Sequence, residues 1–253
     1  MPQAFAGRVA LVTGSGNGIG RATALELAAK GATVGVNDLK PEFVDKVVGE
    51  ITAAGGRALP VVQNVSTREG MWRAVHLMAE TNGRLDVLVN NAAWVRYQAI
   101  PDVAPETMDR MLDIGFKAVI WAIQAAAEVM DSKRGGTIVN LASMAGIVSA
   151  RNSIVYSGIK AGVAGITRAA AAELGPRIRV NAVAPSAVPT EGTMRNRNVE
   201  RDAQRVARMP LGRLGTVEDI AHVVCFLAGD DSGYLTGQTI SADGGYTTSN
   251  LLG

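Results

Sequence analysis

The chain has 253 residues, of which 47% are hydrophobic and 19% charged, and its formal net charge is +2. This composition excludes a disordered chain, and so small a charge gives no basis for binding nucleic acid or a membrane surface. No uncharged apolar run approaches the length of a membrane span, and residues 1–8 lack the pattern of a signal peptide, so we expect neither.

Apolar stretches typical of strands alternate with helical patterns along the whole chain. The predicted strands cover residues 8–13, 33–38, 58–63, 85–90, 137–142, 178–184 and 238–242. The predicted helices cover residues 18–30, 41–54, 67–82, 105–133, 154–174, 200–208 and 216–228. This alternation predicts an α/β fold, in which helices cover both faces of a doubly wound parallel sheet of about seven strands. No linker divides the chain, so we expect residues 1–253 to form a single domain.

The single cysteine, Cys225, excludes an internal disulfide and fits a reducing cytoplasm, where we expect the protein to reside. It lies in an apolar helical segment and is predicted to be a core residue. His76 and His222 stand apart from any set of residues with metal-ligand spacing, so we expect no metal.

A glycine-rich turn follows the first predicted strand. Gly14, Gly16, Gly18 and Gly20 stand between that strand and the first helix. Glycines let the backbone approach a pyrophosphate closely, while a helix N-terminus offers free N–H groups and the positive end of a dipole. The pattern therefore predicts a dinucleotide-binding turn, although a plain strand–helix connection is the alternative.

An acid, Asp38, ends the second predicted strand eighteen residues after Gly20. A carboxylate there can accept hydrogen bonds from a ribose 2′-OH and would repel a 2′-phosphate. Neither Ser15 nor Asn17 in the turn is basic. These residues favour NAD over NADP, and the alternative role for Asp38 is to cap the next helix or to serve as a turn acid.

Tyr156 and Lys160 lie four residues apart on a predicted helix, so both occupy one face of it. An ammonium beside a phenol favours the phenolate and lowers its pKa, which makes the phenol a usable proton donor or acceptor. Ser143 ends an apolar run upstream of this pair. An exposed surface pair is the alternative for an isolated Tyr-x-x-x-Lys pattern.

Taken together, these motifs resemble the short-chain dehydrogenase/reductase family from Gly7 to Tyr246. Asn90-Asn91-Ala92-Ala93 stands where that family has Asn-Asn-Ala-Gly, residues 179–185 match its sixth strand, and residues 243–245 match the end of its last strand. The resemblance implies a Rossmann-like oxidoreductase acting on a secondary alcohol or its ketone. It implies that Tyr156 exchanges the proton, Ser143 hydrogen-bonds the substrate oxygen, and Lys160 lowers the Tyr156 pKa.

The resemblance also implies a cofactor site. Its residues are Gly14, Asn17, Gly18, Ile19, Gly20, Asp38, Asn64, Val65, Asn91, Tyr156, Lys160, Pro185, Val188 and Thr190. Asn64 stands where the family often has aspartate, and its carbonyl oxygen can still accept a hydrogen bond from the adenine amino group.

One departure from the family affects the catalytic set. Gly115 replaces an asparagine that the family uses to hold a water in a proton relay from the lysine. We expect a water or a neighbouring polar group to fill that space, and Gly115→Asn to be tolerated. A dinucleotide-binding scaffold or sensor with weak or no turnover is the alternative of another class.

Three segments are expected to line the substrate pocket, and each contains arginine, which suits an anionic group. The candidates are Trp94, Arg96, Arg151 and Arg195, the last in a flexible loop at about 187–210. The alternative is that these arginines are merely solvated. An alternative reaction, reduction of a 3-oxoacyl thioester, usually goes with NADPH in the family and conflicts with Asp38.

The two predicted helices at about 105–133 and 154–174 carry few charges over much of their length. They are either deep core helices or a subunit interface. The resemblance favours the interface and implies a homotetramer formed through both helices.

Overall fold

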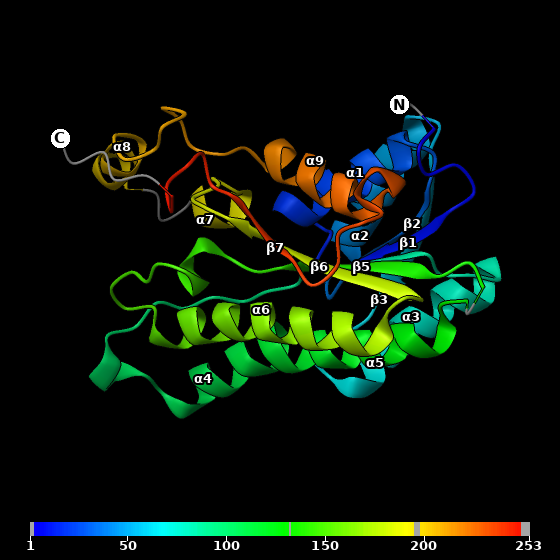
Figure 1. Ribbon diagram of the computed structural model, residues 1–253, viewed down its shortest axis with the longest axis horizontal. Coiled ribbons are helices and arrows are strands. Elements are labelled where there is room, and N and C mark those ends of the chain that lie inside the picture. Colours follow the sequence, from blue (N-terminus) through cyan, green and yellow to red (C-terminus); the bar gives the residue numbers. More distant parts are fainter. Residues whose placement is uncertain (1–2, 132, 195–197, 249–253) are drawn as a thin grey trace.

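One parallel sheet forms the centre of the computed structural model, which describes residues 3–131, 133–194 and 198–248 (Figure 1). Its seven strands lie in the order β3-β2-β1-β4-β5-β6-β7. They are β1 (Val9–Val12), β2 (Thr33–Asp38), β3 (Arg57–Val62), β4 (Val87–Asn90), β5 (Gly136–Leu141), β6 (Ile178–Pro185) and β7 (Thr239–Ala242). The predicted fold class is confirmed. The chain order reverses between β1 and β4, and in such sheets ligands bind beyond the carboxyl ends of the strands at that point.

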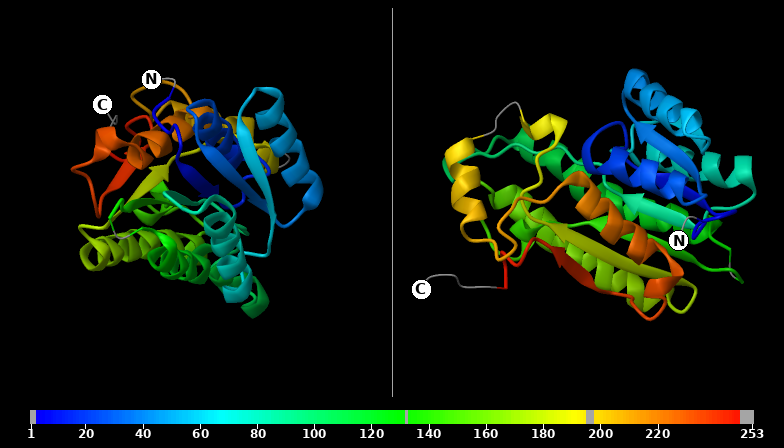
Figure 2. Two further views of the ribbon diagram at one scale, coloured as in Figure 1. Left: turned by 90° about the vertical axis from the view of Figure 1, so that its right-hand side faces the viewer. Right: turned by 90° about the horizontal axis from the view of Figure 1, so that it is seen from above.

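Helices cover both faces of the sheet, because successive strand residues point to opposite sides. Ala10 and Val12 pack with α1 (Gly18–Ala29), α2 (Pro41–Ala53) and α9 (Val217–Ala228). Val9 and Leu11 pack with α3 (Arg68–Asn82), α5 (Ala118–Val129) and α6 (Ile154–Leu174). Figure 2 shows these layers edge-on. Among the described helices, none is long and apolar enough to cross a membrane.

The predicted helix 105–133 is interrupted in the structure. It consists of α4 (Pro105–Leu112), a π turn (Asp113–Lys117) and α5. The short helices α7 (Glu191–Met194) and α8 (Val199–Val206) occupy the predicted flexible loop. Single 3-10 turns cover Ile100–Asp102, Met144–Gly146 and Asp230–Ser232.

The π turn interlocks with α6 through two glycines. A Cβ atom on Gly162 would lie 2.5 Å from Cε2 of Phe116, and one on Gly115 would lie 3.0 Å from Cγ2 of Ile159. Each segment thus accepts a side chain of the other where a glycine leaves room. The atoms nearest to a Cβ at position 115 are therefore the apolar ones of Ile159, while the expected water or polar group beside Gly115 stays a prediction.

A buried chain of polar side chains ties α6 to the sheet. Asn90 Nδ2 donates to Asn140 Oδ1 at 2.9 Å, and Asn140 Nδ2 donates to Thr167 Oγ1 at 3.0 Å. Thr167 in turn donates to the carbonyl oxygen of Val163 at 2.8 Å. Because buried polar groups are costly to leave unpaired, this chain fixes where α6 lies on β4 and β5.

Candidate active site and cofactor cleft

The glycine turn after β1 is pressed against the segment that follows β4. Gly14 has a φ of +61°, and a Cβ atom on it would lie 2.8 Å from Cα of Ala92. A Cβ atom on Gly20 would lie 2.4 Å from Nδ2 of Asn91. That amide nitrogen donates to the carbonyl oxygens of Thr13 and Gly14, both at 2.9 Å. Asn91 therefore holds the turn in place through these two hydrogen bonds. Gly14 and Gly20 are required because neighbouring atoms leave no room for a side chain.

The N-terminus of α1 is open to a ligand. Asn17 precedes the helix in an extended conformation, and its side chain makes no capping hydrogen bond. The first N–H groups of a helix have no partner within it and attract anions. Across from Gly18 stands Thr190, whose Cβ would lie 3.3 Å from a Cβ atom there. The structure thus places Thr190 against Gly18 at this helix N-terminus, whose N–H groups suit a pyrophosphate.

Asp38 ends β2 beside the glycine turn. Its Oδ2 accepts a hydrogen bond from the backbone N–H of Gly16 at 3.3 Å, and its Oδ1 accepts one from Leu39 at 2.8 Å. The residue that caps α2 is Lys40. Asp38 is therefore not the residue that caps α2. Its Oδ1 also accepts a hydrogen bond from the N–H of Lys40 at 3.4 Å, as the turn-acid alternative expects, while the contact with a ribose stays a prediction.

Two polar residues that the sequence did not single out hold this corner in place. Ser15 Oγ donates to the carbonyl oxygen of Val12 at 2.8 Å and accepts from the N–H of Asn37 at 2.9 Å. Asn37 Nδ2 donates to the carbonyl oxygens of Val61 and Gln63 at 2.8 and 3.1 Å. Both side chains are buried, so their role is to join the turn to β2 and β3.

The predicted adenine residues lie in the loop after β3 and beside the core. Asn64 Oδ1 accepts hydrogen bonds from the N–H and the hydroxyl of Ser66, at 3.1 and 2.7 Å. Both bonds stay within the loop, and the contact of this oxygen with adenine stays a prediction. Val65 is buried in the core beside α3, while Ile19 packs partly buried against the opposite core.

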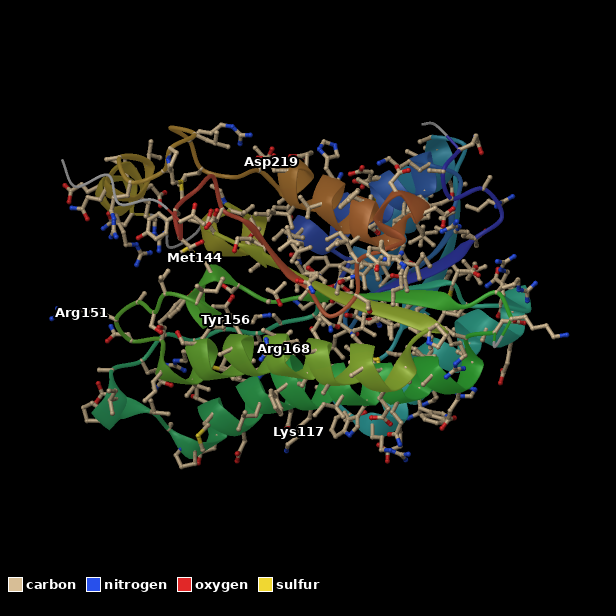
Figure 3. The ribbon with its side chains drawn as sticks, in the orientation of Figure 1. Lys117, Met144, Arg151, Tyr156, Arg168 and Asp219 are labelled. Carbon is tan, nitrogen blue, oxygen red and sulfur yellow. The ribbon has the colours of Figure 1, made fainter. Side chains whose placement is uncertain are left out.

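The structure brings the predicted proton-transfer residues to the carboxyl end of β5. Ser143 is buried and accepts a hydrogen bond from the N–H of Ala145 at 3.1 Å. Tyr156 lies on α6 beneath Met144 (Figure 3). The Nζ atom of Lys160 lies 5.8 Å from the centroid of the Tyr156 ring and donates to the carbonyl oxygen of Leu141.

Burial dominates the electrostatics of this pair. It raises the pKa of Tyr156 to about 12, although a hydrogen bond with Ser143 opposes the rise. It also lowers the pKa of Lys160 to about 8. The expected lowering of the Tyr156 pKa is therefore not seen in the chain alone. The physical reason is that both groups are desolvated, which disfavours the phenolate and the ammonium alike.

The loops that follow β4 and β5 make three contacts in the region of Tyr156. Tyr97 packs edge-on against Tyr156, with ring centroids 5.8 Å apart and planes at 73°. The N–H of Gln98 donates to the carbonyl oxygen of Asn152 at 2.9 Å, which joins the loop after β4 to the loop after β5. Trp94 is half-buried beneath the guanidinium of Arg110, 4.2 Å from its ring centroid.

Of the predicted arginines, the structure places Arg151 away from the site. Arg96 is exposed, and Arg151 lies at the outer edge of the molecule, well beyond Tyr156 (Figure 3). Arg195 lies outside the described residues. The structure instead places Arg201 and Arg205 of α8 near Tyr97, where burial raises the pKa of the Tyr97 hydroxyl and these two charges oppose the rise. No local sequence motif marks them, because a long loop brings α8 back over the site.

The remaining predicted cofactor residues follow β6. Pro185 is the last residue of that strand and is buried. Val188 is half-buried, with its Cγ2 atom 3.2 Å from a Cβ atom built on Gly215.

Comparison with known proteins identifies the arrangement. A family profile described as enoyl-(acyl carrier protein) reductase matches residues 14–247. The 3-oxoacyl-(acyl-carrier-protein) reductase of Thermotoga maritima is 40% identical over 240 residues, covering 94% of this chain and 97% of that protein. The chain belongs to the short-chain dehydrogenase/reductase family.

Other members of the short-chain dehydrogenase/reductase family are similar over almost the whole chain. Cyclohexanol dehydrogenase of an Acinetobacter species is 37% identical and covers 98% of both chains. A crystal structure of 7α-hydroxysteroid dehydrogenase with NADH and 7-oxo glycochenodeoxycholic acid is 28% identical, with a TM-score of 0.92 and 96% of each chain covered. The protein is thus an oxidoreductase of a family that uses a nicotinamide cofactor.

Proposed function

We propose that this protein is an NAD-dependent oxidoreductase that interconverts a secondary alcohol and its ketone. The observation that carries the proposal is the Asp38 carboxylate, held 3.3 Å from the Gly16 N–H at the rim of the glycine turn. A 2′-phosphate beside this carboxylate would meet like-charge repulsion, while a 2′-OH would find an acceptor.

The residues present fit a nicotinamide dinucleotide and divide the chemistry among themselves. When bound, the nicotinamide supplies a hydride acceptor or donor beside the substrate carbon. Tyr156 takes the proton of the substrate hydroxyl during oxidation and returns it during reduction. Ser143 donates a hydrogen bond to the same oxygen and stabilises its developing charge. Lys160, whose Nζ atom lies 5.8 Å from the centroid of the Tyr156 ring, supplies a positive charge that favours the phenolate during the proton exchange.

The surroundings of the site suit an apolar substrate body. Tyr97, Ile147, Val148 and Val95 are all partly or largely exposed on the loops that surround Tyr156. Cyclohexanol dehydrogenase, one of the relatives, bears a name that fits such a substrate. We therefore propose a cyclic or bulky apolar secondary alcohol as the substrate class.

Replacement of Asp38 by serine tests the cofactor assignment. We expect the parent to use NAD with a kcat/KM at least ~100-fold above that for NADP. The variant should narrow this gap by about tenfold or more, because the repulsion between the Asp38 carboxylate and the 2′-phosphate is removed. Asp45→Ser, which removes an exposed acid of α2, is the matched control and should leave the ratio unchanged. Equal kcat/KM for both cofactors in the parent would overturn the assignment.

Reduction of a 3-oxoacyl thioester is the second candidate, favoured by the name of the Thermotoga relative. The two candidates are separated by one panel: cyclic alcohols with NAD, and a 3-oxoacyl thioester with NADPH, both followed by the absorbance of the reduced cofactor. NAD binding without turnover on any alcohol, ketone or thioester would instead favour the scaffold alternative.

We further propose that the protein is a homotetramer formed through the helices at about 105–133 and 154–174. Ile100, Ile120 and Ile154 lie on or beside these helices and are 71%, 43% and 53% exposed in the single chain. We expect light scattering to give the tetramer mass and Ile154→Glu to lower it. Leu77→Glu on α3, where the side chain is 39% exposed, is the control and should leave the mass unchanged. A monomer in the parent would contradict the proposal.

A further inference from the structure

Ile159 occupies a special place beside the catalytic pair. It is one residue from Lys160 and three from Tyr156, and it is 4% exposed. Its Cγ2 and Cδ1 atoms lie 3.0 and 3.8 Å from a Cβ atom built on Gly115. The side chain therefore fills the room that the glycine of the π turn leaves open.

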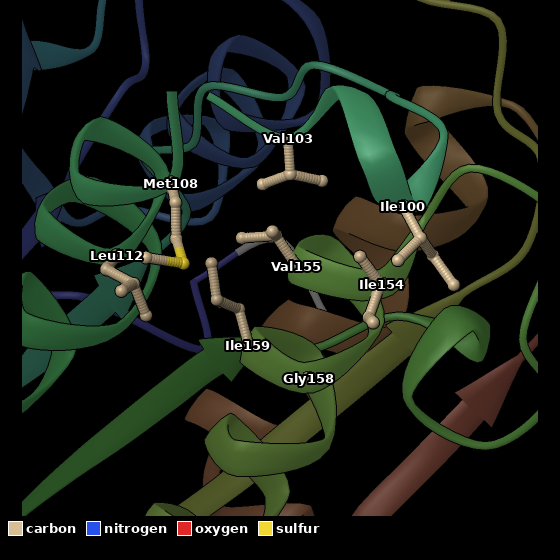
Figure 4. A pocket seen from close by; sticks show the side chains of 8 residues that line it. All are labelled: Ile100, Val103, Met108, Leu112, Ile154, Val155, Gly158 and Ile159. Atoms are coloured by element: carbon tan, nitrogen blue, oxygen red, sulfur yellow. The ribbon is translucent and has the colours of Figure 1, made fainter. Parts of the chain in front are cut away.

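The far side of Ile159 is also apolar. With Leu112, Met108 and Val155 it lines a groove of about 350 Å³ between α4 and α6 (Figure 4). These side chains are hydrocarbon, apart from the thioether of Met108, so none of them forms a strong hydrogen bond with a water. Ile159 thus lies both against the π turn and in the wall of this apolar groove, next to the buried Lys160 in the chain.

We propose that Ile159 is a positioning residue that closes the α4 side of Lys160 to water, so that the ammonium finds polar partners only at Leu141 and in the cleft that holds Tyr156. This inference rests on the proposed function, which gives Lys160 its role. On this proposal, the family asparagine, which implies a polar connection from the lysine through α4, is replaced by Gly115. The apolar side chain of Ile159 fills the space beside that glycine.

The surrounding charges agree with a closed lysine. Burial is the cause that lowers the pKa of Lys160 to about 8. Tyr156 is the titratable group that faces it, 5.8 Å from Nζ, and Tyr97 packs on the outer side of that ring. The charged residues of the π turn, Asp113 and Lys117, pair with each other at 2.8 Å on the exposed side, where Figure 3 shows Lys117 at the surface. Neither brings a charge to the lysine.

The closure predicts a pH effect on stability that needs no substrate. Because the pKa of Lys160 is lower in the folded protein than its ordinary 10.5, the folded state binds fewer protons between about pH 8 and 10.5. Stability contributed by this group therefore rises with pH across that window. We expect the Tm of the parent, taken relative to a Lys160→Met variant at the same pH, to rise by roughly 4 °C from pH 7.5 to 9.5.

Two variants of nearly equal shape separate closure from simple packing. Ile159→Val keeps the apolar plug, so the rise in Tm should remain. Ile159→Thr has the same shape but brings a hydroxyl that admits water, so at least half of the rise should be lost. Each variant is melted with and without Lys160→Met. Equal behaviour of the two variants, or no rise in the parent, would overturn the proposal.

The match between the two positions is tested by a double-variant cycle. Gly115→Asn should lower the Tm because its Cβ atom meets Ile159, and Ile159→Ala in the same chain should restore at least half of that loss. Additive losses would show that the two positions are not matched. None of these melts requires turnover, so an inactive parent would contradict the proposed function without deciding these outcomes.

Discussion

Replacing Tyr156 with phenylalanine is expected to lower kcat at least ~100-fold, the lower end of what general acid–base catalysis contributes. The ring remains, so its edge-on contact with Tyr97 at 5.8 Å and its packing on α6 should persist. Cofactor binding, measured by quenching or enhancement of reduced-nicotinamide fluorescence, and the Tm should therefore stay close to those of the parent.

Tyr97→Phe is the control for that experiment. It makes the same chemical change on the neighbouring ring, which we place in the substrate wall and outside the proton-transfer pair. We expect Tyr97→Phe to change kcat by no more than a few-fold. Any larger effect of this substitution should be on KM. If Tyr156→Phe retained activity within a factor of two, the assignment of the proton donor would be wrong.

Alcohol oxidation is expected to quicken with pH by close to tenfold per unit below about pH 8 and to level off above it. The pair must hold one proton fewer before Tyr156 can accept one from the substrate. In the structure the first proton is lost near the pKa of Lys160, about 8, and the second near that of Tyr156, about 12. Because Tyr156 and Lys160 lie side by side, we expect this rising part of the pH–rate profile to report the loss of a proton from the pair. Ketone reduction should show the opposite trend.

Lys160→Met should move the rising part of the pH–rate profile far to the alkaline side. The variant retains only the tyrosine, whose pKa is raised by burial. Oxidation near pH 8 should then fall by two or more orders of magnitude, as the fraction of usable base falls tenfold per unit. Profiles of kcat and kcat/KM between pH 6 and 10.5 would check this. A limb that stays near pH 8 in the variant would show that another group controls it.

The sequence predicted the elements whose signals are local. The run Val9–Val12 is buried on both faces, and Asp38 lies beside Gly16. Gly14, Gly16 and Gly20 of the turn are required by approaches below 3 Å. Ser143, Tyr156 and Lys160 gather at the end of β5 because strand and helix register place them there. These features follow from periodicity and spacing within one or two elements.

What the sequence could not give depends on contacts between distant segments. The π turn lies where Gly115 and Gly162 meet side chains of the facing segment. No pattern in the amino-acid sequence indicates that these two glycines pack against Ile159 and Phe116. The pKa of Tyr156 depends on burial, which the Tyr-x-x-x-Lys spacing does not report. Arg201 and Arg205 reach Tyr97 through the fold, while Arg151, a neighbour in sequence, does not.

The hydrogen bonds of Ser15 and Asn37 have a consequence for ligand binding. They join the turn to β2 and β3 without help from a bound molecule, at distances of 2.9, 2.8 and 3.1 Å. The turn beside Asp38 is therefore fixed by contacts within the protein, so a dinucleotide that binds there should lose little ordering entropy. Adenosine fragments such as ADP should consequently act as competitive inhibitors against the dinucleotide.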